Sequence, residues 1–84
     1  MNNTAHAKAD SAEIKAALAA RKVASKNYAA AVRHFDSIPA RDEVEKEVAF
    51  FYLGKATDAL KAARADFIRI GNRLATENFN RLAR

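Results

Sequence analysis

The chain has 84 residues with a formal net charge of +5, about half of its residues are apolar, and it contains no cysteine. A chain of this length forms one domain with a small core, and without cysteine neither a disulfide nor a thiolate-bound metal can reinforce that core. No apolar run reaches the roughly 18 residues of a membrane span. The opening stretch MNNTAHAKAD lacks the apolar segment of a signal peptide. We therefore expect a cytoplasmic protein that does not contact a membrane.

The composition predicts an all-α fold, because alanine is abundant and only two glycines and one proline interrupt the chain. We expect residues 1–9 to be frayed and a first helix to span 10–36, since Asp10 and Glu13 have the spacing of a capping box. The helix should end there because Ile38 precedes Pro39, which disfavours the helical backbone at the residue before it. Its core face collects the apolar residues at helical spacing: Ile14, Ala17, Leu18, Ala24, Tyr28, Ala31, Val32 and Phe35.

The opposite face of this first helix carries cationic residues that fall within about 40° of one another. This basic stripe consists of Lys8, Lys15, Lys22, Lys26 and Arg33. No acidic residue accompanies it, so the stripe repels itself and adds nothing to folding. Two interpretations stay open: a solvated face that keeps the protein soluble, or a contact surface for phosphates or for an acidic protein. Binding to nucleic acid would be non-specific, because no sequence-reading motif accompanies the stripe.

A second helix is expected over residues 40–82, with Pro39 leading into its first turn. The acidic cluster of Asp42, Glu43, Glu45 and Glu47 fits the positive end of the helix dipole, which gives it a structural explanation. Gly71 and Asn72 interrupt the pattern. Either the helix continues to 82, or it breaks at 71–72 and a short third helix folds back. A continuous helix would be about 60 Å long against about 40 Å for the first, so its end would need another chain.

Four large apolar residues stand together at 50–53, in the run AFFYLGKA. Successive helical residues point about 100° apart, so a single partner helix cannot cover all four. The side facing the first helix is expected to hold Tyr52, Ala56, Ala59, Leu60, Ala63, Phe67, Ile70 and Leu74, with Leu53 at its margin. A second apolar surface remains, formed by Val44, Val48, Phe50, Phe51, Ile68 and Phe79. It predicts either a helical bundle of two hairpins, as a homodimer, or a face kept for a larger protein.

The segment NYAAAVRHF resembles the second helix of a tetratricopeptide repeat, with Tyr28, Ala31 and Phe35 at the spacing of that family. Leu18–Ala19 and the later Leu53–Gly54 stand where the family carries its Leu–Gly pair. The resemblance implies helix pairs that stack around a peptide-binding groove. The unbroken apolar stripe of the first helix favours one long helix instead, so we expect no stacked repeats, and peptide binding stays open.

No group of residues has the make-up of a reaction centre. His6 and His34 are far apart in sequence and lack the Glu-x-x-His pair of a helical metal site. Ser11, Ser25 and Ser37 have no nearby base, and no glycine-rich phosphate loop is present. We therefore expect no catalysis, no metal and no cofactor.

The sequence thus predicts a non-enzymatic protein–protein interaction module, most simply a homodimer, that docks on a larger protein as an adaptor, assembly factor or inhibitor. The main alternative is a small basic helical protein that binds nucleic acid non-specifically. A purely structural subunit of an assembly would show the same apolar excess.

Overall fold

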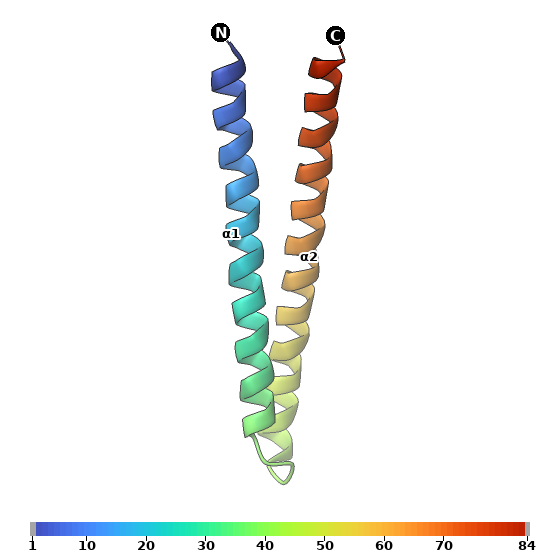
Figure 1. Cartoon of the computed structure of the whole chain (residues 1–84). Coiled ribbons are helices and arrows are strands. Elements are labelled where there is room, and N and C mark those ends of the chain that lie inside the picture. The colour runs from blue at the N-terminus through green and yellow to red at the C-terminus, as the bar shows by residue number, and fades with distance from the viewer. Residues whose placement is uncertain (1, 84) are drawn as a thin grey trace.

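The computed structural model describes the backbone of residues 2–83 and the side chains of residues 10–83. Two helices, α1 (Asn2–Ser37) and α2 (Glu43–Leu82), form an antiparallel hairpin that measures 65 × 17 × 12 Å. The turn lies at one end and both termini lie at the other, toward which the two ribbons draw apart (Figure 1). The predicted all-α helical hairpin is confirmed, and residues 2–83 contain no strand.

The alternative of a short third helix is wrong for the described chain, because α2 runs without a break through Gly71 and Asn72. Gly71 does not adopt a positive φ, so it is an ordinary helical residue and not a left-handed cap. The expected mismatch in length also disappears, since α1 begins at Asn2 and has 36 residues against 40 in α2. α1 likewise runs without the internal turn that a tetratricopeptide repeat would need.

The turn between the helices spans residues 38–42. It begins one residue later and ends three residues later than expected. α1 ends at Ser37, directly before the Ile38–Pro39 pair that disfavours further helix. Pro39 lies in the turn, where its carbonyl oxygen accepts a hydrogen bond from the backbone N–H of Asp42 at 3.0 Å. α2 therefore begins at Glu43, and the N–H of Lys46 donates to the Asp42 carbonyl at 2.9 Å as the first helical bond.

The two helices meet along a seam in which inward residues recur at alternating intervals of three and four. In α1 the seam holds Ile14, Ala17, Arg21, Ala24, Tyr28, Ala31 and Phe35, and Ile38 of the turn continues it; in α2 it holds Lys46, Ala49, Leu53, Ala56, Leu60, Ala63, Phe67, Ile70 and Leu74. Tyr28, expected in the core, is partly open to solvent at the edge of the seam. Alanine recurs every seven residues through part of each helix, at Ala17, Ala24 and Ala31 and at Ala49, Ala56 and Ala63. This is the heptad pattern of a left-handed antiparallel coiled coil, and the alanines let the two backbones approach closely.

Tyr52 and Ala59 were expected to face α1, and this expectation is wrong because both are exposed. Their places are taken by Ala49 and Leu53, which are buried and half-buried. The reason is the period of the pattern. A straight helix of 3.6 residues per turn drifts about 20° per heptad away from a seam that repeats every 3.5 residues. Over a 40-residue helix, a period of 3.6 residues per turn therefore assigns some positions to the wrong side.

The core along this seam is thin, because two helices cannot enclose a side chain from all sides. Its buried centre is the cluster of Ala17, Ile70 and Leu74, against which Ile14 and Phe67 pack. No large side chain among residues 10–83 is completely buried. The hairpin therefore has less buried apolar surface to stabilise it than a globular domain of the same length.

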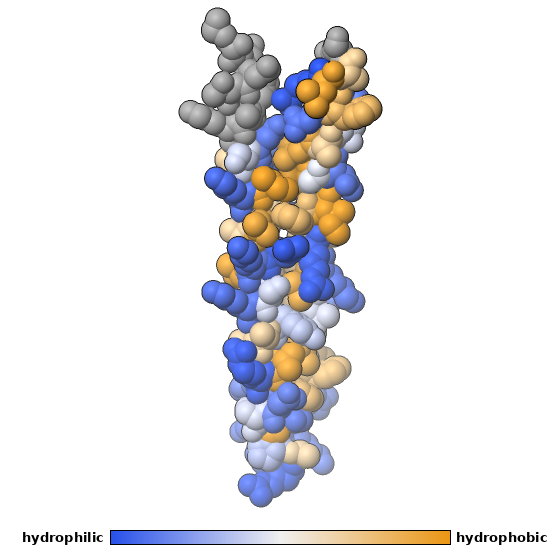
Figure 2. All heavy atoms as spheres, viewed as in Figure 1, coloured by the Kyte–Doolittle hydropathy of each residue, from blue (hydrophilic) through white to orange (hydrophobic). Residues whose placement is uncertain are grey.

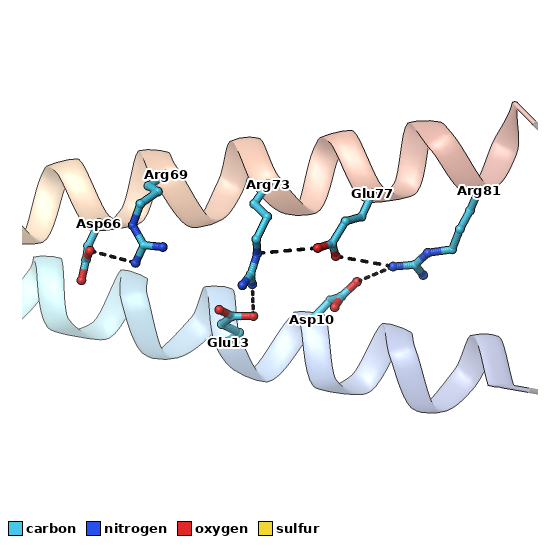
Figure 3. A network of polar contacts seen from close by, with 7 residues as sticks. All are labelled: Asp10, Glu13, Asp66, Arg69, Arg73, Glu77 and Arg81. Atoms are coloured by element: carbon cyan, nitrogen blue, oxygen red, sulfur yellow. Dashed lines mark hydrogen bonds and ion pairs between the residues drawn. The ribbon is translucent and has the colours of Figure 1, made fainter.

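Charged residues bridge the helices near the open end, as Figure 3 shows. From α2, Arg73 pairs with Glu13 and Arg81 lies 3.3 Å from the Asp10 carboxylate, while Glu77 lies within 4 Å of both arginines. These side chains are partly exposed, so each pair contributes at most about 1 kcal/mol. Because Asp10 and Arg81 lie on the seam line, the pairs also fix the register in which α1 and α2 meet.

Candidate interaction surface

All six residues of the predicted second apolar surface are exposed on α2: Val44, Val48, Phe50, Phe51, Ile68 and Phe79. Phe51 is 63% exposed and Phe79 is 70% exposed, although both are large apolar side chains. Solvent-exposed apolar residues are normal when scattered singly, but a monomer rarely gathers this many on one helix. The structure therefore leaves this surface uncovered within one chain.

The surface divides into two groups along α2. Near the turn, Val44, Val48 and Phe51 follow one another at intervals of four and three and so share the side of the helix away from α1. Phe50 lies to one side of this line, where its ring is 6.3 Å from that of Phe51 and 6.3 Å from that of Phe35 on α1. Phe50 therefore belongs partly to the closure of the hairpin.

The second group lies toward the open end, where Ile68 and Phe79 are joined by Leu82, which is 87% exposed. In the face drawn in Figure 2, apolar residues reach the surface of α2 near this end, and hydrophilic residues line the outer edge of α1. The site residues predicted from sequence did not include Leu82, although a projecting end of the second helix was expected to need another chain. Tyr52 was also missed, since it was assigned to the inward face.

Lys46 has a role that the sequence analysis did not identify. Its Nζ donates hydrogen bonds to the carbonyl oxygens of Phe35 at 2.9 Å and Ile38 at 3.1 Å, at the carboxyl end of α1. The same ammonium lies 4.0 Å from the centre of the Phe35 ring. A cation at this position satisfies carbonyl groups that a helix end leaves unpaired and interacts favourably with the helix dipole. Lys46 therefore ties the start of α2 to the end of α1.

Beside this lysine lies a shallow apolar hollow of about 340 Å³, lined by Phe35, Ala40, Glu43, Lys46, Glu47 and Phe50. The apolar walls come from the two phenylalanines, and the charged residues stand at the rim. Nothing in the hollow resembles a reaction centre, since its ionisable groups are surface residues of the first turn of α2.

The basic stripe is exposed where the structure describes its side chains, at Lys15, Lys22, Lys26 and Arg33. Within residues 10–83 none of these four has a carboxylate within 4.0 Å, in contrast to Arg69, Arg73 and Arg81 of α2. The side chain of Lys8 lies outside the described residues. Arg21 is different from the stripe, because it lies in the seam with its guanidinium 4.6 Å from the centre of the Phe67 ring.

Residues 10–83 contain no group of three histidine, aspartate or glutamate side chains able to hold a metal ion. His34 is exposed beside the turn, and the side chain of His6 lies outside the described residues. No helix in the described part of the chain is long and apolar enough to cross a membrane.

Comparisons with known proteins give no relative from which a role could be transferred. The chain matches no protein family, no curated protein and no solved structure at a significant level. The surfaces of the hairpin are therefore the features that bear on its function.

Proposed function

We propose that the chain is a non-enzymatic protein–protein interaction module that acts through the exposed apolar side of α2. One observation carries the proposal: Val44, Val48, Phe50, Phe51, Ile68 and Phe79 are all exposed on a single helix. Apolar surface of this kind is favourable to bury and is typical of contact sites. In this proposal the module works in the cytoplasm as an adaptor, assembly factor or inhibitor on a larger protein.

The exposed area of the chain supports the same proposal. The hairpin exposes 6618 Å², whereas a compact monomer of 9.2 kDa exposes about 4,900 Å². The excess of about 1,700 Å² is as large as the whole area buried in a standard protein–protein interface. The excess follows from the elongated shape of the hairpin, which is 65 Å long, and it is spread over both helices.

Photo-crosslinking in cells that express the chain from its own gene tests this proposal. The photoreactive residue p-benzoylphenylalanine replaces Phe51 or Phe79, where an aromatic side chain already stands. The matched control replaces Val23, which is 57% exposed on α1. We expect discrete protein adducts from positions 51 and 79 and few from position 23. Adducts that are equal at all three positions, or absent from all three, would contradict the proposal.

A second candidate function is non-specific binding of nucleic acid, and it is favoured by the cationic side chains of Lys15, Lys22, Lys26 and Arg33. They are exposed and have no carboxylate partner within residues 10–83. Contacts of this kind would follow the phosphate backbone, with an affinity that falls steeply with salt and does not depend on base sequence. Fluorescence anisotropy with two unrelated DNA duplexes, measured from low to physiological salt, tests this alternative.

A further inference from the structure

On one side of α2, the exposed apolar residues are arranged symmetrically along the helix. We call it the back face and define it by Val48, Phe51, Ala65, Ile68, Phe79 and Leu82. All six are exposed and point away from the seam with α1. The back face is not continuously apolar, so the order of its residues along the helix carries more information than its composition.

The order is symmetric about Ala65. Phe51 and Phe79 lie fourteen residues before and after it, and Val48 and Leu82 lie seventeen residues before and after it. Closer in, Ala62 and Ile68 stand three residues on either side. Val48 and Phe51 therefore each have an apolar counterpart at the same distance on the other side of Ala65, whereas Phe50 corresponds to Asn80.

We infer that the back face pairs with the back face of a second copy of this chain, antiparallel, with a two-fold axis at Ala65. In such an isologous contact each residue meets the residue that is equidistant from the axis on the partner. Phe51 meets Phe79 of the other copy, Val48 meets Leu82, and Ala65 meets itself. This inference rests on the proposed function, because it names the partner of part of the exposed apolar surface.

The polar residues within the back face fit the same arrangement. Asp58 and Asn72 stand seven residues either side of Ala65, so each carboxylate faces an amide that can donate to it. Lys61 and Arg69 also become neighbours, four residues either side of the axis. Their charges are offset by Asp58 and by Asp66, which already lies 3.0 Å from Arg69 in the hairpin.

Charge disfavours a parallel pairing of the two α2 helices. It would place every residue against its own copy, so that Asp58 faces Asp58 and Arg69 faces Arg69. Juxtaposed like charges cost several kcal/mol at an interface. The antiparallel pairing replaces the contact between two Asp58 carboxylates with a contact between Asp58 and Asn72, although Lys61 and Arg69 then become neighbours.

The area available is sufficient for a stable dimer. A standard interface buries about 800 Å² on each partner, which is less than half of the excess of about 1,700 Å² that each hairpin exposes. Obligate homodimers bury about 2,000–5,000 Å². The arrangement also leaves the basic stripe of α1 and the hollow at Phe35 and Phe50 on the outside of the four-helix assembly, free for a further partner.

Disulfide crosslinking tests the register directly, because the chain has no cysteine of its own. Ala65→Cys puts the two sulfurs at the two-fold axis, where helices packed 8–10 Å apart bring the facing Cα atoms within disulfide reach. We expect mild oxidation to convert most of this variant to a covalent dimer. Circular dichroism before oxidation checks that the variant is still helical.

Asp58→Cys is the matched control on the same line of the back face. Its two copies would lie about 21 Å apart along the helix axis, fourteen residues at 1.5 Å each, too far for a disulfide. We expect no crosslink from Asp58→Cys alone or from Asn72→Cys alone, and a mixed disulfide when the two variants are combined. Ala30→Cys, on the exposed side of α1, reports random collisions.

The inference is overturned if Ala65→Cys crosslinks no more than Ala30→Cys, or if Asp58→Cys crosslinks with itself. A failure of the self-pairing can also be distinguished from a failure of the proposed function. If Ala65→Cys gives no dimer while p-benzoylphenylalanine at position 51 still captures a different protein in cells, the self-pairing fails and the proposed function stands.

Discussion

The seam between α1 and α2 and the back face of α2 both carry large apolar residues, but only one of them is covered within the chain. In the seam, alanine alternates with larger residues, and every position has the other helix opposite. In the back face, Phe51 and Phe79 stand in water with nothing opposite. The seam therefore determines the fold, whereas the back face adds nothing to the stability of a single hairpin.

The largest effect is expected from shortening a buried leucine in the seam. Leu60→Ala should lower the free energy of unfolding by about 2–4 kcal/mol, because Leu60 is buried and the space it leaves cannot collapse fully. Leu82→Ala is the matched substitution on the back face and should cost less than about 0.5 kcal/mol in dilute protein, where no partner covers it. Urea unfolding followed by circular dichroism compares the two variants. Equal losses in the free energy of unfolding would show that the seam and the back face contribute equally to stability.

A smaller effect is expected at the closed end of the seam. Lys46→Met keeps the aliphatic stem but removes both hydrogen bonds to the end of α1 and the contact with the Phe35 ring. We expect a loss of about 1–2 kcal/mol in the free energy of unfolding. Lys55→Met, at an exposed position of the same helix, serves as control, and an equal effect of the two would show that Lys46 does not hold the turn.

Gly71→Ala should stabilise the hairpin by about 0.4–1 kcal/mol, because alanine is the better residue inside a helix. A Cβ at this position would meet only the Cδ1 of Ile14, at an ordinary contact distance of 3.9 Å. Gly54→Ala, with nothing within 4 Å of its Cβ, should act in the same direction. The measurement is the shift of the thermal midpoint, and a destabilised Gly71→Ala variant would mean that the end of α2 bends there.

The smallest effect on folding is expected from the basic stripe, which belongs to neither region. Reversing Lys15, Lys22 and Lys26 to glutamate should change stability by less than about 0.5 kcal/mol per site, because exposed charges contribute little. Affinity for DNA at low salt should fall strongly if the stripe binds phosphates. The control reverses Lys55 and Lys61 on α2. Unchanged affinity in the triple variant would leave the stripe a solvated face.

Much of this architecture could be predicted from sequence. The Ile38–Pro39 pair placed the end of α1, and the run at 50–53 showed that one partner helix could not cover all the apolar residues of α2. Predicting a second apolar surface required only the 100° step between helical residues, and its six members are exposed as expected.

Three features could not be predicted in the same way, each for a physical reason. Tyr52 was misplaced because the supercoil changes the period of the seam, and this drift accumulates over the length of α2. The role of Lys46 depends on where the turn brings its ammonium, which residue spacing does not reveal. The symmetry about Ala65 became apparent only after the seam was known, since the back face is defined as what the seam leaves exposed.

The mass of the protein in solution tests the central claim that the back face pairs with a second copy. Sedimentation equilibrium of the unmodified chain at high micromolar concentration should give twice the 9.2 kDa of one chain. Phe51→Asp should give 9.2 kDa with the helix content retained, because an unpaired charge cannot be buried cheaply in an apolar contact. Val23→Asp, the same change at an exposed position of α1, should stay dimeric. A monomeric unmodified chain, or a Phe51→Asp variant that stays as dimeric as Val23→Asp, would contradict the account.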